Sequence, residues 1–282
     1  MERSKITVPD LQAKKERGEK IVRIVCYDYP MAVLADRAGV DAILVGDSVG
    51  MVQLGMNSTI PVTMEEMIHH CKAVMRGAKY ALVIGDLPFL SYQTGERDAV
   101  LNAGRLLKEG GVDAVKLEGG KEMVPIVKAI AQAGISVMGH IGLTPQTASK
   151  LGGFKVQGRD AATAGRLIED AKALEDAGAF MLSLECVPDR LAQAITHDLR
   201  IPVTGIGAGP YTDGQSILLY DLVGLYPRFT PKFVKRYANL SEQIVQALER
   251  FSQEVKDGSF PAPEHCYSIG DQELEAVLKR QP

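Results

Sequence analysis

Ionisable side chains occur near the carboxyl ends of several short segments of this chain that are otherwise apolar and rich in β-branched residues. They are Asp28, Asp47 with Ser48, Asp86, Lys116 with Glu118, His140 and Glu185. Burying several carboxylates together is unfavourable unless they have partners, so a cation is expected among them. We therefore expect these segments to converge on one site that binds a cation and a small anionic, oxygen-rich substrate.

The donor atoms of this set favour a magnesium ion. Asp47, Asp86 and Glu118 offer hard oxygen ligands, and Mg²⁺ typically keeps some waters and takes substrate oxygens as its remaining ligands. Zinc is disfavoured, because only one histidine lies nearby and the four cysteines are far apart, with no CxxC pair. The predicted metal site is Asp47, Asp86 and Glu118.

The remaining groups predict chemistry on a 2-oxo acid. Lys116 is a compact positive charge suited to a substrate carboxylate. A divalent ion beside it would polarise the ketone and stabilise negative charge next to the carbonyl. Glu185 ends an otherwise apolar segment, and partial desolvation there would make it a better proton acceptor. We expect proton abstraction beside a carbonyl, followed by formation or cleavage of a carbon–carbon bond.

Each of these residues, taken alone, also has a simpler explanation. An aspartate after a strand is often the N-cap of the next helix, which explains Asp28 equally well. Lys116 and Glu118 could be a structural ion pair, and His140 could be a core histidine bonded to a backbone carbonyl. These explanations do not account for ionisable groups at the same end of six different segments.

Eight short apolar runs alternate with segments of helical periodicity and would position these groups. The runs are 21–28, 41–48, 80–88, 113–119, 136–143, 180–187, 202–209 and, more weakly, 220–226. Eight strand–helix units without a composition break predict an α/β protein, a single-domain (β/α)8 TIM barrel over residues 1–282. An open, doubly wound sheet is the alternative, because the eighth run is short.

Several helix ends are visible in the sequence. Thr63 and Glu66 have the spacing of a capping box, and Asp160 can cap a helix that ends near residue 178. An extra N-terminal helix over about 7–17 is expected to cover the barrel floor. An amphipathic helix from 231 to about 256 follows the last strand, and a C-terminal tail covers about 257–282.

Strand alternation predicts which side chains share the barrel interior. Lys116 and Glu118 are two residues apart, so they face the same way. The same parity holds within the pairs Val45/Asp47, Ile84/Asp86, Met138/His140 and Ser183/Glu185. If the charged member of each pair points inward, all of them meet at the carboxyl-end mouth, where barrel enzymes carry their active sites.

The composition excludes several functional classes. The 282 residues include 32 Lys+Arg and 35 Asp+Glu, a formal net charge of −3, which argues against a nucleic-acid binder. The N-terminus lacks the apolar region of a secretory signal, and no stretch approaches the ~18 consecutive apolar residues of a membrane span. The separated cysteines give no disulfide framework. We expect a cytoplasmic protein that binds small molecules, with neither nucleic acid nor membrane as a partner.

Two short motifs match functional patterns without the expected context. Residues 46–50 (GDSVG) match the GxSxG of serine hydrolases, but the next predicted helix begins only at residue 63. Residues 205–209 (GIGAG) lack the spacing of a dinucleotide loop, which leaves phosphate binding and close backbone approach as alternatives. The long loop 142–159 is either a lid or a surface or oligomer contact.

Longer motifs follow one another along the chain. They are VCYDYPMAVLADRAGVDAILVGDSVGMVQLG, DLPFLSYQ, AVKLEGG, VMGHIGLTPQ, LGGFKVQGR, LECVP, GIGAG, DGQ and PKFVKRYANL. From about residue 4 to about residue 267, this order closely resembles the ketopantoate hydroxymethyltransferase family of the phosphoenolpyruvate/pyruvate barrel group. The chain departs from the usual family pattern at 25–26, 211–212 and 216–217, outside the matched site positions.

The resemblance implies a function for the chain. It implies Mg²⁺-dependent transfer of a hydroxymethyl group from 5,10-methylenetetrahydrofolate to 3-methyl-2-oxobutanoate, giving 2-dehydropantoate for pantothenate and coenzyme A biosynthesis. It also implies a homo-oligomer, which is typically a decamer in bacteria.

The resemblance also assigns roles to individual residues. Asp47, Asp86 and Glu118 match the metal site, and Glu185 matches the proton acceptor. The matching substrate contacts are Asp47, Ser48, Asp86, Lys116 and His140. A metal-dependent 2-oxo-acid lyase and a non-catalytic binding protein are the alternative functions.

Overall fold

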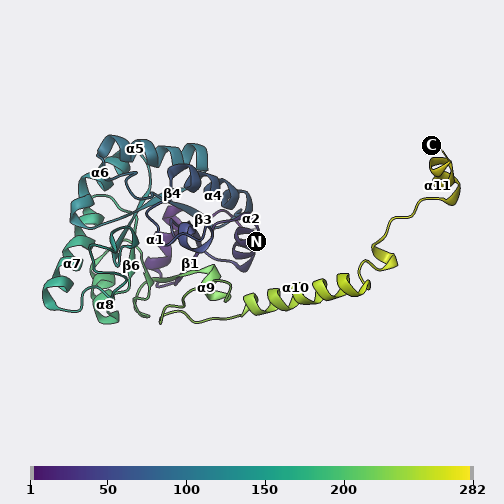
Figure 1. Ribbon diagram of the computed structural model, residues 1–282. Coiled ribbons are helices and arrows are strands. Elements are labelled where there is room, and N and C mark those ends of the chain that lie inside the picture. Colours follow the sequence, from purple (N-terminus) through teal and green to yellow (C-terminus); the bar gives the residue numbers. More distant parts are fainter. Residues whose placement is uncertain (1–2, 280–282) are drawn as a thin grey trace. The chain divides into compact units, whose positions relative to one another are not determined.

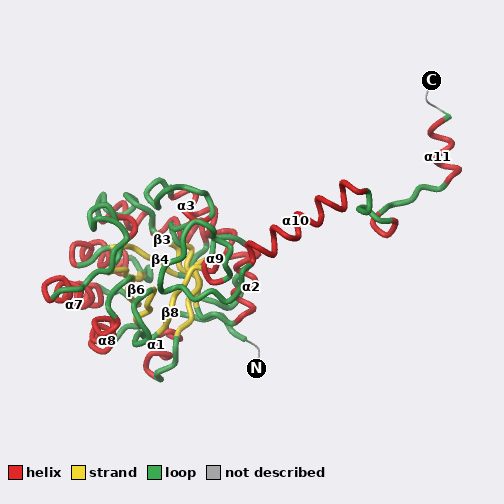
Figure 2. Tube along the Cα trace, turned by 60° about the horizontal axis from the view of Figure 1, so that its bottom comes forward, coloured by secondary structure: helices red, strands yellow, loops and turns green. Residues whose placement is uncertain are grey.

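Eight parallel strands close into a barrel in which each strand pairs with its neighbours in chain order. The computed structural model describes residues 3–279, and the strands are β1 (Ile21–Val25), β2 (Ala42–Val45), β3 (Leu82–Asp86), β4 (Ala114–Glu118), β5 (Val137–Gly142), β6 (Met181–Glu185), β7 (Val203–Ile206) and β8 (Gly214–Leu218). Figure 2 shows these strands in yellow, enclosed by helices. Pairing of β1 with β8 confirms the predicted barrel and excludes the open sheet.

Helices lie outside the strands and at the ends of the chain (Figure 1). The α-helices are α1 (Val8–Glu16), α2 (Tyr29–Ala38), α3 (Val49–Val52), α4 (Met64–Gly77), α5 (Glu96–Arg105), α6 (Val124–Gln132), α7 (Ala161–Asp176), α8 (Asp189–Asp198), α9 (Leu219–Leu222), α10 (Leu240–Asp257) and α11 (Asp271–Leu278). A short π-helix, Leu106–Gly110, extends α5, and short 3₁₀-helices occur at Lys121–Met123, Pro145–Thr147 and Pro263–His265.

The predicted helix caps and the N-terminal helix are confirmed. The Thr63 side chain accepts a hydrogen bond from the Glu66 N–H (3.2 Å), and the Asp160 side chain accepts one from the Thr163 N–H (2.9 Å). In α1, Lys15 Nζ donates to Asp213 Oδ2 (2.8 Å), immediately before β8 begins. The helix therefore lies at the amino ends of the strands, as predicted.

The eighth strand does not lie where the sequence pattern predicts it. β8 is Gly214–Leu218, whereas residues 220–226 form α9 and the turn after it. β8 (GQSIL) begins with Gly, Gln and Ser instead of an apolar run, and a Cβ on Gly214 would lie only 2.2 Å from the Ile21 carbonyl oxygen. Close packing against β1 therefore defines this strand, and the connection from β7 to β8 contains no helix.

The long C-terminal helix begins later than predicted. α10 starts at Leu240 and not near residue 231, because the preceding backbone bonds elsewhere: the Tyr237 N–H donates to the Leu222 carbonyl (2.8 Å). The chain divides into one compact unit that extends to Tyr237 and a second that begins at Ala238. No helix in the described residues is long and apolar enough to cross a membrane.

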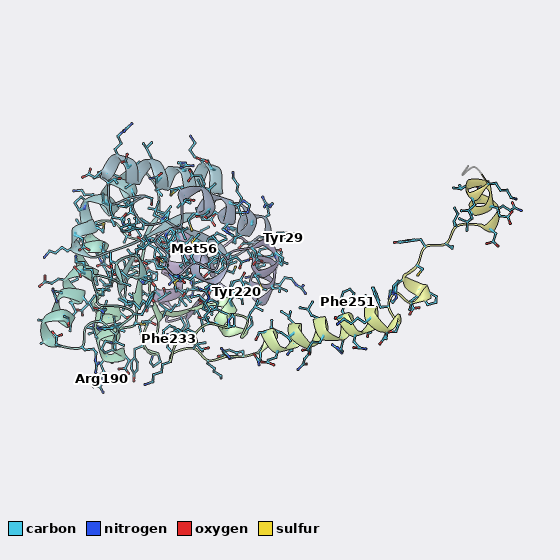
Figure 3. The ribbon with its side chains drawn as sticks, viewed as in Figure 1. Tyr29, Met56, Arg190, Tyr220, Phe233 and Phe251 are labelled. Carbon is cyan, nitrogen blue, oxygen red and sulfur yellow. The ribbon has the colours of Figure 1, made fainter. Side chains whose placement is uncertain are left out.

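One face of α10 carries large apolar side chains that are exposed to solvent. They are Ile244, Val245, Leu248, Phe251 and Val255, of which Phe251 is labelled in Figure 3. Their helical spacing forms a single stripe, which is typical of a helix that packs against a partner.

Candidate active site

A cavity of about 580 Å³ at the carboxyl ends of the strands brings together the predicted site residues, with the exception of Asp28. Its lining includes Asp47, Ser48, Asp86, Lys116, Glu118, His140 and Glu185. Asp28 is not part of this lining: its side chain caps α2 by accepting from the Met31 N–H (2.9 Å) and also accepts from the Tyr220 hydroxyl. The simpler explanation, an N-cap, therefore holds for Asp28.

Strand register explains how most of these side chains reach the cavity. Asp86 pairs with Lys116, and Glu118 pairs with His140. Paired residues of parallel strands face the same side of the sheet. Along β6, Glu185 lies two residues beyond Ser183, which pairs with His140. The predicted parity is therefore confirmed for β3 to β6.

The predicted parity is wrong for Asp47. Leu44, not Val45, pairs with Ile84, so Leu44 shares the interior face with Asp86. β2 ends at Val45, and the chain turns after it, which brings Asp47 into the cavity from a turn. The Asp47 N–H donates to Asp86 Oδ2 (3.2 Å) and holds the turn in place.

Lys116 is the central cation of the site. Its Nζ lies 2.7 Å from Asp86 Oδ2 and 3.3 Å from Glu118 Oε1, and the side chain is buried. Burial disfavours the charged form, but the carboxylates of Asp86, Glu118 and Asp47 outweigh this effect and raise the pKa of Lys116 above its usual value. Lys116 therefore stays positively charged.

One lysine does not neutralise the carboxylates of Asp47 and Asp86. Burial, followed by the charge of Asp86, raises the pKa of Asp47 well above its usual value, and burial also raises the pKa of Asp86. Asp86 Oδ1 is buried without a hydrogen-bond partner among the described residues. A divalent cation beside Asp86 Oδ1 and Asp47 would offset the repulsion between the two carboxylates and supply the contact that Asp86 Oδ1 lacks.

The donor set fits Mg²⁺ better than a metal that needs a full protein cage. Within residues 3–279, no group of three or more His, Cys, Asp or Glu side chains is arranged to hold a metal by itself. Mg²⁺ is typically bound through one or two carboxylates and completes its shell with water and substrate oxygens. Asp47 and Asp86 provide such a pair.

Both oxygens of Glu118 are already used by protein groups. Oε1 lies 3.3 Å from Lys116 Nζ and 3.3 Å from His140 Nδ1, and Oε2 accepts from the Gln146 N–H (3.0 Å). Burial works against its charge, but Lys116 and His140 more than compensate and lower the pKa of Glu118 to about 2. Glu118 is therefore a fixed anion that orients its neighbours.

His140 lies between two glutamates. Its Nε2 is 3.2 Å from Glu185 Oε2 and its Nδ1 faces Glu118, although neither contact has the alignment of a well-formed hydrogen bond. Burial and Lys116 disfavour the imidazolium, but the two glutamates outweigh them and raise the pKa of His140. The Glu185 side chain keeps 16% of its surface exposed, so it is the carboxylate best placed to meet a substrate.

The serine of the GDSVG motif is not a hydrolase nucleophile. A short helix, α3, does begin directly after Ser48, contrary to the sequence analysis. However, Ser48 Oγ pairs with the Tyr27 hydroxyl (2.8 Å) and not with a histidine. Tyr27 therefore orients Ser48, which lines the cavity.

Gln146 and Tyr92 are two residues of the site that were not predicted from the sequence. Gln146 Nε2 donates to Asp47 Oδ2 (2.9 Å) and to the Leu87 carbonyl (2.9 Å), and Tyr92 donates to Gln146 Oε1 (2.7 Å). The Gln146 backbone N–H also donates to Glu118, so Gln146 links Asp47 and Glu118. The HIGLTPQ motif was the available signal, since it placed this glutamine at the start of a long loop.

Arg23 was also missed. This arginine is only 2% exposed, lies inside the barrel, and donates to Ser216 Oγ (3.0 Å) and Ser183 Oγ (2.8 Å). Burial lowers its pKa to about 10, although Asp86 and Glu185 oppose the shift. The signal was a lone charge inside the apolar run IVRIV. Arg23 remains charged and adds positive potential below the cavity.

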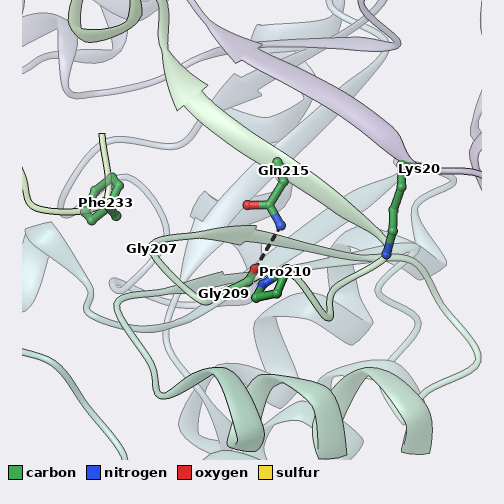
Figure 4. Close-up of a pocket in the computed structure, with 6 residues that line it drawn as sticks. All are labelled: Lys20, Gly207, Gly209, Pro210, Gln215 and Phe233. Carbon is green, nitrogen blue, oxygen red and sulfur yellow. Dashed lines mark hydrogen bonds between the residues drawn. The ribbon is translucent and has the colours of Figure 1, made fainter. Parts of the chain in front are cut away.

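A second cavity, of about 490 Å³, is lined by the glycine-rich β7–β8 connection (Figure 4). Gln215 Nε2 donates to the Gly209 carbonyl there (2.9 Å), and Lys20 Nζ donates to the Thr212 carbonyl. A Cβ on Gly207 would lie 2.6 Å from the Phe233 ring, and one on Gly209 would lie 2.3 Å from Asp189 Cβ. Close packing therefore explains the GIGAG motif without a phosphate.

Comparisons of the sequence with known proteins all identify the same enzyme family. A model of the family described as ketopantoate hydroxymethyltransferase matches residues 5–263. A 3-methyl-2-oxobutanoate hydroxymethyltransferase of Moorella thermoacetica is 62% identical over 94% of this chain and 99% of that protein. The enzyme of the same name from Enterococcus faecalis is 54% identical over 97% of this chain and 99% of that protein.

Solved structures with similar folds are more distant in sequence. Phosphonopyruvate hydrolase in complex with oxalate and Mg²⁺ has a TM-score of 0.58 and 14% identity, with 98% of this chain and 99% of that chain covered. 2,3-Dimethylmalate lyase, a member of the PEP mutase/isocitrate lyase superfamily, has a TM-score of 0.57 and 17% identity, with 97% and 99% covered. At this identity the likeness concerns the fold alone.

Proposed function

The chain belongs to the ketopantoate hydroxymethyltransferase family, and from this premise we propose that it transfers a hydroxymethyl group from 5,10-methylenetetrahydrofolate to 3-methyl-2-oxobutanoate. The product is 2-dehydropantoate. The observation that carries the proposal is the convergence of a charged lysine, a pair of unneutralised carboxylates and a partly exposed glutamate on one cavity.

Asp47 and Asp86 are proposed to hold Mg²⁺, supported by the unpartnered Asp86 Oδ1. When bound, this ion supplies a Lewis acid that polarises the 2-oxo group of the substrate. Glu118, predicted as a third metal-site residue, supports the site by fixing Lys116 and His140, because both of its oxygens are already engaged.

Lys116 binds the carboxylate of the oxo acid, and Ser48 and His140 complete the substrate contacts. Lys116 suits this role because it stays charged and its neighbours hold its ammonium group in one place. Ser48 is oriented by Tyr27, and His140 by Glu118. The oxo acid is thus held with its C3 toward the partly exposed carboxylate of Glu185.

Glu185 takes the proton from C3, and His140 positions Glu185 for that step. The electron pair left at C3 then forms a bond to the one-carbon unit. Both bonds from that carbon to the folate nitrogens N5 and N10 break, and water supplies the hydroxyl oxygen through a new carbon–oxygen bond. The proton taken by Glu185 and one proton of the water go to the two nitrogens, and tetrahydrofolate leaves. The sum is 3-methyl-2-oxobutanoate, methylenetetrahydrofolate and water giving 2-dehydropantoate and tetrahydrofolate.

The active form is proposed to be a homo-oligomer, specifically a decamer. The apolar stripe on α10 supports this proposal, because five large apolar side chains on one helix face are unfavourable in water.

Deuterium wash-in at C3 of 3-methyl-2-oxobutanoate, followed by a full turnover assay, tests the proposed reaction. The wild type is expected to exchange this hydrogen in a Mg²⁺-dependent manner and to form 2-dehydropantoate only with methylenetetrahydrofolate. Conversion of the oxo acid without any folate would indicate a metal-dependent 2-oxo-acid lyase. Absence of deuterium exchange at C3 would contradict the proposed mechanism.

Glu185→Gln tests the role of the base. Loss of the carboxylate is expected to slow C3 exchange by at least about 100-fold while Mg²⁺ binding persists. Glu169→Gln is the matched control, because Glu169 is exposed and far from the cavity lining. Normal exchange in Glu185→Gln would exclude Glu185 as the base.

A further inference from the structure

Asp221 is an acid in the active-site cavity that the proposed reaction does not use. It lies in α9, directly after β8, and is only 6% exposed. Its side chain lines the same cavity as Lys116 and Glu185. Among the described residues, no side chain or backbone group donates a hydrogen bond to its carboxylate, and no lysine or arginine forms an ion pair with it.

The other acids of the cavity contrast with Asp221, because each has a protein partner. Asp47 accepts from Gln146, Asp86 from Lys116, and Glu185 lies beside His140. Burying a carboxylate without a partner is unfavourable, and burial raises the pKa of Asp221 to about 6, although Arg236 opposes the shift. Because no described protein group donates to its oxygens, the Asp221 carboxylate can accept hydrogen bonds from a ligand.

The oxo acid is not that ligand. Its carboxylate would be repelled by Asp221, whereas Lys116 offers it a positive charge in the same cavity. The cavity of about 580 Å³ lies in the range of about 300–1,000 Å³ found for drug-sized ligands. It is therefore larger than a five-carbon acid alone requires.

The surroundings of the cavity suit a flat ring system with an anionic tail. Aromatic and aliphatic side chains line it from the 142–159 loop and from the segment after α9, namely Phe154, Val156, Tyr226, Phe229 and Phe233. Figure 3 labels Phe233 on the segment that precedes α10. Lys155 and Lys232 line the same cavity and can meet carboxylates of a ligand tail.

We propose that Asp221 is the anchor of the folate subsite and accepts two hydrogen bonds, from the 2-amino group and the adjacent ring N–H of the pterin. These two donors lie side by side, as in a guanidinium group, and a carboxylate can accept both at once. The aromatic side chains pack against the ring faces. This inference rests on the proposed function, because it assigns the site of the one-carbon donor.

Asp221→Asn in the full-length protein tests the anchor. Titration calorimetry with tetrahydrofolate is expected to show binding weakened by about 10- to 100-fold, because a charged acceptor is lost. The KM for methylenetetrahydrofolate should rise by a similar factor, whereas C3 exchange of the oxo acid, which needs no folate, should fall far less. Asp189→Asn is the matched control, since Asp189 is an exposed acid near the same end of the barrel.

A ligand analogue gives a second test that does not depend on the variant's folding. Wild-type protein is expected to bind 2-desamino-2-methyl-tetrahydrofolate about tenfold or more weakly than tetrahydrofolate. In Asp221→Asn this difference should largely vanish. Equal binding of both ligands by the wild type, or unchanged tetrahydrofolate binding in Asp221→Asn, would overturn the proposal.

The outcomes also separate this proposal from the proposed function. If the wild type binds tetrahydrofolate through its 2-amino group but shows no C3 exchange, the subsite stands and the proposed reaction fails. If exchange and turnover are normal and Asp221→Asn leaves the folate KM unchanged, the reaction stands and the subsite assignment fails.

Discussion

At the scale of single residues, the site depends on side chains that are held by other side chains. Asp47 reaches the cavity from a turn, and Gln146, 99 residues away in sequence, holds its Oδ2. Glu118 has the same dependence, because Gln146, Lys116 and His140 occupy its oxygens. The geometry of the acidic groups is therefore a property of the network rather than of any one strand.

Gln146→Ala tests this network. The variant should lose about 10- to 100-fold in apparent Mg²⁺ affinity, because residues that orient metal ligands typically contribute that much. The measurement is the Mg²⁺ dependence of C3 exchange. Gln157→Ala is the control, because Gln157 lies in the same loop and its side chain donates to the Lys155 carbonyl, not to an acidic residue of the site. An unchanged Mg²⁺ dependence in Gln146→Ala would contradict the positioning role.

The buried carboxyl of Asp221 predicts a pH-dependent stability. Its pKa is raised from 3.8 to about 6 in the folded protein, so the folded state favours the protonated form. The resulting stabilisation is fully present below the unfolded pKa and is lost as pH rises through about 6. Relative to Asp221→Asn, the wild type should therefore lose stability between about pH 4 and pH 7.

Thermal unfolding of both proteins across this pH range measures the effect. Arg236 is the charged group that opposes the shift, and Lys155 and Lys232 line the same cavity. A constant difference in unfolding temperature at all pH values would contradict the raised pKa.

At the scale of secondary-structure elements, helix–strand connections are fixed by buried polar groups. Asp36 of α2 is 3% exposed and accepts hydrogen bonds from three consecutive backbone N–H groups, those of Lys79, Tyr80 and Ala81. These residues connect α4 to β3, so one carboxylate ties two strand–helix units together. β3 in turn ends at Asp86, and its position sets the depth of that side chain in the site.

Asp36→Ala is expected to destabilise the protein by about 3 kcal/mol, because it removes the acceptor of three backbone N–H groups, of which that of Ala81 is buried. Urea unfolding at a fixed protein concentration measures the change. The adjacent Arg37→Ala serves as control, because Arg37 is exposed and should change stability by less than about 0.5 kcal/mol. Similar stabilities of the two variants would show that backbone relaxation or water replaces the carboxylate.

At the scale of the whole molecule, the closed barrel gives all strands one common mouth, and the ends of the five strands β2 to β6 can therefore contribute predicted residues to one site. The sheet lacks a covering helix between β7 and β8. The second unit contains α10, whose apolar stripe is exposed in the single chain. Assembly with other copies is the expected way to cover such surfaces.

The double substitution Leu248→Glu/Phe251→Glu tests this assembly. Wild-type protein is expected to have ten times the 30.5 kDa chain mass in light scattering, and the variant is expected to form smaller species. Gln246→Glu/Gln253→Glu is the matched control, because it adds the same two charges to α10 outside the apolar stripe. A monomeric wild type, or an unchanged mass in the stripe variant, would contradict the proposed role of the stripe.

The sequence by itself determined the features that depend on local periodicity. Alternating apolar runs and helical segments predicted the closed barrel, and side-chain parity predicted the inward direction of Asp86, Lys116, Glu118, His140 and Glu185. Local caps such as Thr63 and Asp160 were visible because a cap and its partner lie within one helical turn.

Only the tertiary structure decided the features that depend on contacts between distant segments. β8 is defined by its fit against β1, Gln146 by its contact with Asp47, and the isolation of Asp221 by the absence of a donor in the described residues around it. Hydrogen bonding, burial and charge compensation act through space. A residue's role in them is fixed by its neighbours in the fold and leaves no periodic pattern in the chain.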